Sequence, residues 1–567
     1  MNREEKYDIV IVGGGPNGTA LAAYLAKSGL SVCVLEERPE CGGACENTEP
    51  VPGVRIDPHA TYMYSGAAPG FDQLELWKYG FRMDWRTILD IDPADLEARK
   101  RFGSLTTDGV VPMTDKDILG WATITGQLAE TPFSRELLRA IFWCPPHPPE
   151  VEVTTDNIPY MQVYKQYASD IWTEELLDMT MFELMDEYLD TEPFKVMQAG
   201  IAWYSGAAPH WEGVAIPSLG GALNMYYAQI TPPRGGMHAF FHSIIRCAMA
   251  HGVVFRTCCP VDEIIIREGR AVGVRLKDNA AWGEKMIWAD KAVVSDVDIQ
   301  QTFLKLIGPQ HLDVGFIQQI KDISLKGGSI YVSHFLFREP PRYRPKFKGR
   351  EGMIADGIWY PCDSREIYYE HLMDVDGKKG SPSIPPERVL WVSCGSKMNI
   401  PDACRIPDHT LVSPFYVVVP PPEYHADSPD AIDKGKWDAY MLQAYSQVAE
   451  NVEPPNLVAQ WSNPPWESEF RNAGLIGGTW CGTRHCKDQL WINRPLPELS
   501  RYRVPFIDGL YLCNQTAGHP GGLALMAIPY NLMHILIEDG IVEPGDWWYP
   551  SPWYIPERGK ISAIPRR

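Results

Sequence analysis

The feature that most constrains the fold is a strand–turn–helix–strand pattern at residues 7–36. Tyr7–Val12 is a short β-branched run, which is typical of a buried parallel strand. After a glycine cluster, Thr19–Ser28 alternates small and apolar residues at helical spacing, and Gly29 ends this predicted helix. Ser31–Leu35 predicts a second strand. The segment is therefore one βαβ unit with a glycine-rich turn at the entrance of its helix.

This turn has the spacing of a dinucleotide-binding loop. Gly13 permits the tight turn, and Gly15 lets the backbone approach a pyrophosphate at the helix N-terminus. Gly18 allows close packing of the helix on the strand. The residues of this loop predicted to bind a cofactor are Gly13, Gly15, Pro16, Asn17 and Gly18.

An acidic residue, Glu36, ends the second strand, where its carboxylate would accept hydrogen bonds from ribose hydroxyls and repel a 2′-phosphate. Three further segments favour FAD over NAD: a second glycine pair, a late strand whose backbone can address the adenine, and a strand that runs into a glycine-rich helix entrance. The residues predicted to contact FAD in these segments are Glu37, Arg38, Gly42, Gly43, Ala44, Val261, Asn514, Gly522 and Leu523.

The rest of the chain alternates between nucleotide-binding and substrate-facing segments. Glu174–Tyr188 has apolar positions at helical spacing and predicts a helix. We expect an α/β fold: a Rossmann-like FAD-binding domain with a mainly parallel sheet, plus an α+β substrate domain. The predicted boundaries are 1–115, 231–328 and 481–540 for the FAD-binding domain, 116–230 for a helical substrate region, 329–480 for the substrate domain and 541–567 for an aromatic, Pro-rich tail.

Charge and cysteine content exclude several classes of protein. The net charge of −20 leaves no basic stripe for a nucleic acid and disfavours adhesion to an anionic membrane. The 13 cysteines show no four-ligand zinc spacing, so we predict no metal site and reduced thiols. The first residues contain no apolar stretch that would make a signal peptide, and the expected location is cytoplasmic.

Five segments together resemble a known family. They are 7–45, 52–62, 233–244, 259–276 and 488–522, and the last of them is the most specific. On these segments the chain resembles the phytoene-desaturase-like branch of FAD-dependent oxidoreductases with the amine-oxidase fold. Within that branch it is similar to the subgroup called pyridine nucleotide-disulfide oxidoreductase domain-containing protein two. The resemblance implies one noncovalent FAD and redox chemistry on a carbon–carbon bond of a fairly apolar substrate.

The chain departs from the family pattern at two places. Gly482 stands where the subgroup usually carries a histidine, and the nearest histidine is His485. The stretch Asn514–Gly518 is one residue longer than the usual run of glycine and alanine. Both departures fall where the resemblance places the substrate against the flavin.

His59 and His519 are the candidate catalytic residues, because each sits in a segment expected near the flavin ring and a histidine can accept or donate a proton. We expect the substrate to lie among His59, Tyr62, residues 477–485 and residues 514–519. The predicted activity is that of a FAD-dependent oxidoreductase acting on CH–CH bonds. A redox-neutral isomerase or hydratase and a nonenzymatic FAD-holding scaffold stay open as alternatives. The expected partners are an apolar small molecule and an electron acceptor, with homo-oligomerisation and transient membrane contact left open.

Overall fold

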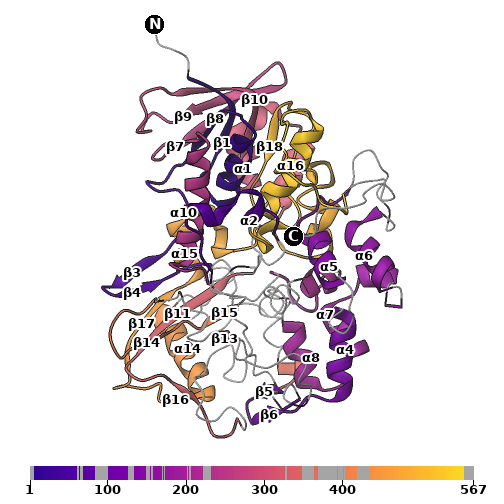
Figure 1. Cartoon of the computed structure of the whole chain (residues 1–567), viewed down its shortest axis with the longest axis vertical. Helices are drawn as coiled ribbons and strands as arrows, with labels where there is room; N and C mark the ends of the chain where they lie inside the picture. Colours follow the sequence, from indigo (N-terminus) through magenta and orange to yellow (C-terminus); the bar gives the residue numbers. More distant parts are fainter. Residues whose placement is uncertain are drawn as a thin grey trace.

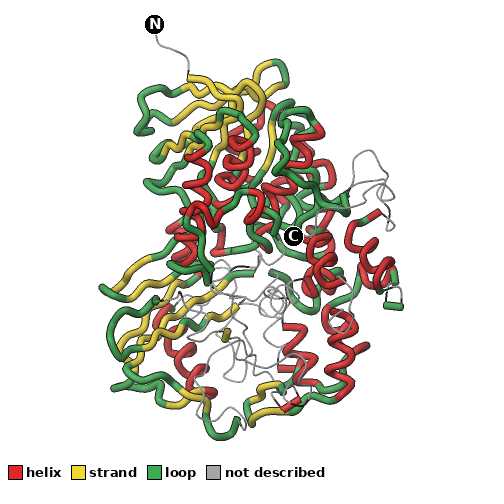
Figure 2. Tube along the Cα trace, viewed as in Figure 1, coloured by secondary structure: helices red, strands yellow, loops and turns green. Residues whose placement is uncertain are grey.

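Figure 1 shows the computed structural model of the chain, in which a sheet with its helices forms the upper part and a second sheet and a group of helices lie below it. Figure 2 shows the same division by secondary structure, with strands at the top and lower left and helices at the lower right. The structure describes residues 5–60, 63, 68–83, 97, 100–101, 103–125, 133–147, 154, 157–168, 170–171, 173–200, 202, 206–220, 232–325, 328–347, 363–367, 369, 392–393, 400, 402–417 and 433–554.

The upper sheet has seven strands in the order β7-β2-β1-β10-β9-β8, with β18 also paired to β10. The strands β7, β2, β1, β10 and β18 are parallel, whereas β9 and β8 run antiparallel. The predicted mainly parallel sheet is thus confirmed. The bounds are β1 (Glu5–Val12), β2 (Val32–Leu35), β7 (Val254–Arg256), β8 (Val261–Arg267), β9 (Arg270–Leu276), β10 (Met286–Ser295) and β18 (Leu510–Leu512).

The strand β10 is long enough to have two neighbours along one edge. Met286–Trp288 pairs with β9, and Val293–Ser295 pairs with β18. Its other edge pairs with β1 along nearly its whole length. The carboxyl ends of β1, β2, β10 and β18 therefore meet at the same edge of the sheet, where α/β folds place their ligands.

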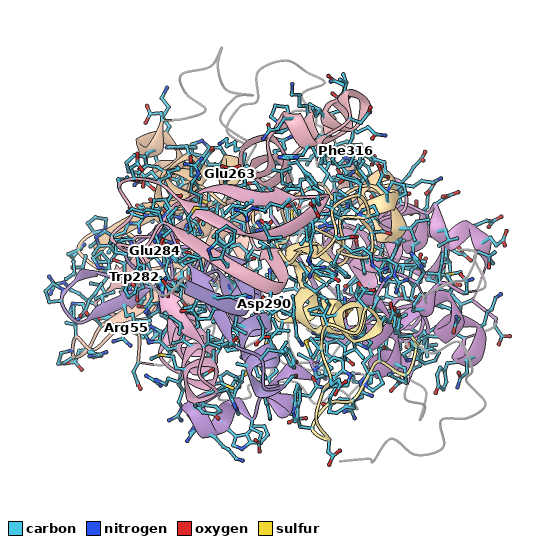
Figure 3. The ribbon with its side chains drawn as sticks, turned by 90° about the horizontal axis from the view of Figure 1, so that it is seen from above. Arg55, Glu263, Trp282, Glu284, Asp290 and Phe316 are labelled. Atoms are coloured by element: carbon cyan, nitrogen blue, oxygen red, sulfur yellow. The ribbon has the colours of Figure 1, made fainter. Side chains whose placement is uncertain are left out.

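Two helices contact α1 (Pro16–Lys27) beside this sheet: α10 (Gly236–Ala250) and α16 (Ala527–Glu538). α1 is made of small and apolar residues and is almost wholly buried, because it is packed between the other two helices and the strands. Figure 3 shows the molecule from above and labels Trp282, before β10, and Asp290, within β10; both residues are exposed.

The aromatic segment near the C-terminus packs on the same helices. The Trp547 ring stacks on Tyr24 of α1 with 6.0 Å between centroids, and Trp548 contacts the Tyr530 ring of α16. Trp553 and Tyr554 are 5% and 6% exposed. The described part of this aromatic segment therefore packs against other parts of the same chain.

The second sheet is antiparallel and is built around β11 (Ile330–Phe337). β11 pairs with β14, β15 and β17, and α14 (Lys434–Val448) lies beside it. This sheet with its helix confirms the predicted α+β part of the fold. The bounds of the other strands are β3 (Thr48–Val51), β4 (Val54–Ile56), β5 (Ser104–Thr106), β6 (Gly109–Val111), β12 (Arg342–Tyr343), β13 (Val392–Ser393), β14 (Thr410–Val412), β15 (Phe415–Val417), β16 (Ala449–Glu450) and β17 (Leu457–Asn463).

The helical group contains one correction to the sequence prediction. Glu174–Tyr188 is not one helix, because Thr180 caps a new helix there: its hydroxyl accepts from the Glu183 amide while the Glu183 carboxylate accepts from the Thr180 amide. Among the described residues, no helix is both long enough and apolar enough to cross a bilayer. The bounds of the larger helices here are α4 (Asp115–Thr125), α5 (Phe133–Phe142), α6 (Pro159–Tyr167), η3 (Glu174–Leu177), α7 (Met181–Tyr188) and α8 (Glu192–Ala199).

The remaining short elements connect these layers. They are α2 (Gly70–Gln73), η1 (Leu76–Tyr79), α11 (Ile299–Gln301), η5 (Thr302–Ile307), η6 (Pro309–His311), α12 (Val314–Asp322), α15 (Pro465–Arg471), η10 (Ile476–Gly478), η11 (Lys487–Gln489), η12 (Trp491–Asn493), η13 (Pro497–Leu499) and η14 (Gly521–Leu523).

Candidate functional site

The predicted dinucleotide loop joins the end of β1 to α1. Gly13 has a φ of +101°, a conformation that L side chains rarely adopt. Gly15 is the N-cap of α1 and Pro16 follows at its first position, where a missing amide proton costs nothing. The partial positive charge at this helix end favours an anion. The loop is thus shaped to hold a pyrophosphate.

Glu36 lies against this loop, as the spacing predicts. Its Oε2 accepts from the Gly14 amide at 2.8 Å, and its Oε1 accepts from the Arg38 amide at 2.8 Å. Burial raises the pKa of its carboxyl. The carboxylate therefore sits at the end of β2 beside the turn, which is where the ribose of a dinucleotide needs an acceptor.

The second glycine pair touches the first loop. The Gly42 amide donates to the Gly14 carbonyl at 2.9 Å, and a Cβ on Gly43 would lie 3.3 Å from the Gly15 Cα. Arg38 Nη1 donates to the Gly43 carbonyl. Both glycines have positive φ values. The fold thus brings the two predicted glycine segments together, with Glu37 exposed at the surface beside them and Ala44 facing the cavity described below.

Val261 begins β8 next to this cluster. The Cys258 amide donates to the Arg38 carbonyl, and the Cys259 amide donates to the Glu36 carbonyl at 2.8 Å. The segment before Val261 therefore runs beside the residues predicted to hold the ribose. The contact between Val261 and adenine stays a prediction.

Asp296 is a part of this site that the sequence prediction missed. Its Oδ2 accepts from the Gly18 amide at 2.9 Å, and a Cβ on Gly15 would lie 2.7 Å from the same oxygen. Burial raises the pKa of Asp296 well above its usual value, which favours the uncharged acid under a loop that receives phosphate. The signal was present, since the acid directly follows the strand that pairs with β1. Asn514 braces the same turn by donating to the Asp296 carbonyl at 2.9 Å.

A cavity of about 160 Å³ opens at the end of the loop. Its lining begins at Pro16, Asn17 and Ala44 and reaches Gly522 on the far side. None of the described lining residues is an aspartate, glutamate, lysine or arginine. The wall is mostly apolar: Met237, Ile330, Val332, Phe415, Leu475, Trp480, Ala524 and Leu525.

His59 is the one histidine among the described residues that line this cavity. Its Nδ1 lies 3.3 Å from Glu46 Oε1, and its side chain is 8% exposed. Burial lowers the pKa of His59 to about 4, despite the opposing charge of Glu46. The imidazole is therefore neutral at physiological pH and able to accept a proton.

The structure does not bring His519 to the cavity. Its ring is fully buried, contacts the Trp491 ring in a tilted arrangement with 3.9 Å between centroids, and has Nε2 against the Ile141 carbonyl. Burial lowers the pKa of His519 to about 3. Through these contacts, His519 stabilises the turn that carries Gly522. Leu523 ends the short helix η14 after that turn, and its side chain lies outside the described residues, as does Tyr62.

Arg494 connects the two segments that differ from the family pattern. Its fully buried guanidinium donates from Nη2 to the carbonyls of Cys481 and Gln515, both at 2.8 Å. A Cβ on Gly482 would lie 3.0 Å from the Gln515 carbonyl oxygen and from Thr516. Gln515 and Thr516 thus take the space that a side chain at position 482 would need.

Known proteins that are similar to this chain share its overall fold, and a family model matches the segment that contains the dinucleotide loop. Residues 11–74 match the family model described as NAD(P)-binding Rossmann-like domain. The chain is 26% identical to pyridine nucleotide-disulfide oxidoreductase domain-containing protein 2 of Rattus norvegicus over 94% of each chain. It is 22% identical to a limonene dehydrogenase component of Castellaniella defragrans over 99% of each chain. Wild-type putrescine oxidase bound to putrescine is a structural neighbour with a TM-score of 0.52 and 16% identity, covering 95% of this chain and 100% of that one.

These relatives confirm the resemblance that the sequence motifs indicate. The chain is a homologue of flavin-type oxidoreductases and has the fold of the amine oxidases. FAD is the cofactor that its loop and its fold support. The residues fit that group: the loop has no room for a Cβ at Gly15, which would lie 2.7 Å from Asp296 Oδ2, and the second glycine pair lies against the loop.

Proposed function

We propose that this chain is a FAD-dependent oxidoreductase that acts on a carbon–carbon bond of a fairly apolar small molecule. The observation that carries the proposal is the apolar cavity at the end of the dinucleotide loop, with His59 as its titratable residue among the described lining. When bound, FAD supplies an acceptor or donor of hydride at its N5 atom.

The residues of the chain have distinct tasks in this proposal. The glycine loop and Glu36 hold the ADP half of the cofactor, and the apolar wall positions the substrate and keeps water out. His59 takes a proton from the carbon next to the one that loses hydride, or returns it in the reverse direction. Glu46, 3.3 Å from Nδ1, orients the ring for this transfer.

The lining favours an apolar substrate over an amine. A cationic amine in a dry cavity needs a carboxylate nearby, and the described lining residues include none. The relative named as part of a limonene dehydrogenase points in the same direction, since its named substrate is a hydrocarbon. Putrescine oxidase, which is named for a diamine, shares the fold only.

Anaerobic mixing with apolar alkenes and alkanes tests the proposal. We expect one such compound to bleach the visible absorption of the oxidised flavin once per chain, with a product that differs by two hydrogens. Bleaching by amines but by no hydrocarbon would overturn the substrate class. Product formation without bleaching and without an electron acceptor would instead support a redox-neutral isomerase or hydratase, and no reaction with any compound would favour a scaffold.

A further inference from the structure

We propose that Glu40, His238 and His242 form a binding site for a divalent transition-metal ion, with Zn²⁺ as its occupant, on the outer side of the cofactor loop. His238 and His242 are four residues apart in the first turns of α10, so they share one face of the helix. Glu40 comes from the segment between β2 and the second glycine pair. The proposal is independent of the proposed function. It departs from the prediction of no metal site, which rested on the cysteine spacing alone.

The three side chains converge on one point. Glu40 Oε1 lies 3.0 Å from His238 Nε2 and 3.8 Å from His242 Nε2. One ligand atom from each residue lies within 4.8 Å of the others. Zinc bonds to nitrogen and oxygen are about 2.0–2.2 Å long, so two ligands of one tetrahedral ion lie roughly 3.3–3.5 Å apart. The two separations between Glu40 and the histidines bracket that value.

The histidine rings are oriented as metal ligands usually are. His238 Nδ1 lies 3.3 Å from the Cys45 carbonyl, which can accept a hydrogen bond from it, while Nε2 faces Glu40. The two imidazole centroids are 4.1 Å apart.

One Glu40 oxygen faces two imidazole nitrogens in this arrangement. A single pair between Glu40 and His238 would need no second imidazole, yet His242 Nε2 faces the same carboxylate oxygen. Two histidines and one carboxylate are a donor set that suits Zn²⁺. The side chains are 63%, 19% and 37% exposed for Glu40, His238 and His242, so an ion can enter from solvent and keep a water ligand.

The site would act on the cofactor loop. The Cys45 carbonyl that orients His238 belongs to the segment whose Gly42 amide bonds to Gly14. An ion held by Glu40 and α10 would tie this segment to the helix. We therefore expect Zn²⁺ to raise the thermal midpoint of the protein and to slow the release of FAD.

Calorimetric titration of the chelator-treated full chain with Zn²⁺ tests the site. We expect one ion per chain, with an affinity that falls about tenfold or more in Glu40→Gln and in His242→Ala. His251→Ala is the matched control, because this exposed histidine at the end of the same helix is outside the cluster and its loss should change nothing. Titration with Co²⁺ adds a ligand signature, since nitrogen and oxygen ligands give no thiolate charge-transfer band.

Three results would overturn the proposal: absence of saturable one-to-one binding, full affinity in both variants, or a cobalt spectrum with thiolate bands. The last result would place the ion on cysteines. Metal binding is measured without turnover, so its failure would leave the proposed enzymatic function untouched.

Discussion

Gly15→Val is expected to produce a folded protein that has lost most of its FAD. The added Cβ would meet Asp296 Oδ2 at 2.7 Å, and the larger side chain would stand where the pyrophosphate needs the backbone. Overpacking of this kind costs about 1–3 kcal/mol. The same amount lost from cofactor binding would weaken the affinity for FAD about fivefold to 150-fold. The flavin content after purification and the affinity on reconstitution measure the effect.

Gly283→Ala is the matched control for this loop variant. Gly283 has no heavy atom within 4 Å of an added Cβ and no positive φ, so the variant should keep its flavin. Circular dichroism separates loss of FAD from loss of fold. Stoichiometric FAD in Gly15→Val would show that the loop does not hold the cofactor as described.

His59→Ala is expected to reduce turnover by about 10²–10⁴-fold, the usual contribution of a general base, with the flavin absorption unchanged. The side chain lines the cavity, and its nearest charged partner is Glu46 rather than a loop residue. The assay is turnover with the compound found by anaerobic mixing. His311→Ala, an exposed histidine of η6, is the control and should be fully active.

The pH dependence of wild-type turnover is a second test of His59 as the base. Only the neutral ring accepts a proton, and its pKa is lowered to about 4 by burial. Turnover should therefore stay level from about pH 8 to pH 5 and fall as the pH drops through 4. A loss below tenfold in His59→Ala, or a pH profile that rises between pH 6 and 7, would contradict the assignment of His59 as the base.

The sequence predicts the dinucleotide loop well because its signals are local. The positions of Gly13, Gly15 and Gly18 are fixed by one turn between neighbouring elements, and Glu36 follows from the length of the helix between two strands. Asp296 was missed because it approaches the loop through a strand pairing between residues far apart in the chain.

The two histidines show where sequence reasoning fails. Both follow motifs expected near the flavin, but only His59 reaches the cavity. The place of His519 is decided by long-range packing on Trp491 and Ile141, which no local pattern encodes. The proposed metal site is only partly visible in the sequence. The four-residue spacing of His238 and His242 is a local pattern, whereas Glu40 comes close to them only in the folded chain.

The cofactor of the wild-type protein is the most direct test of the proposed site. The purified protein should be yellow and release one FAD per chain when denatured, as identified by mass and by chromatography against FMN. The loop, Glu36 and the second glycine pair are all arranged for the ADP half that FMN lacks. A colourless protein that cannot be reconstituted with FAD, or one that releases FMN, would contradict the assignment of this loop to FAD.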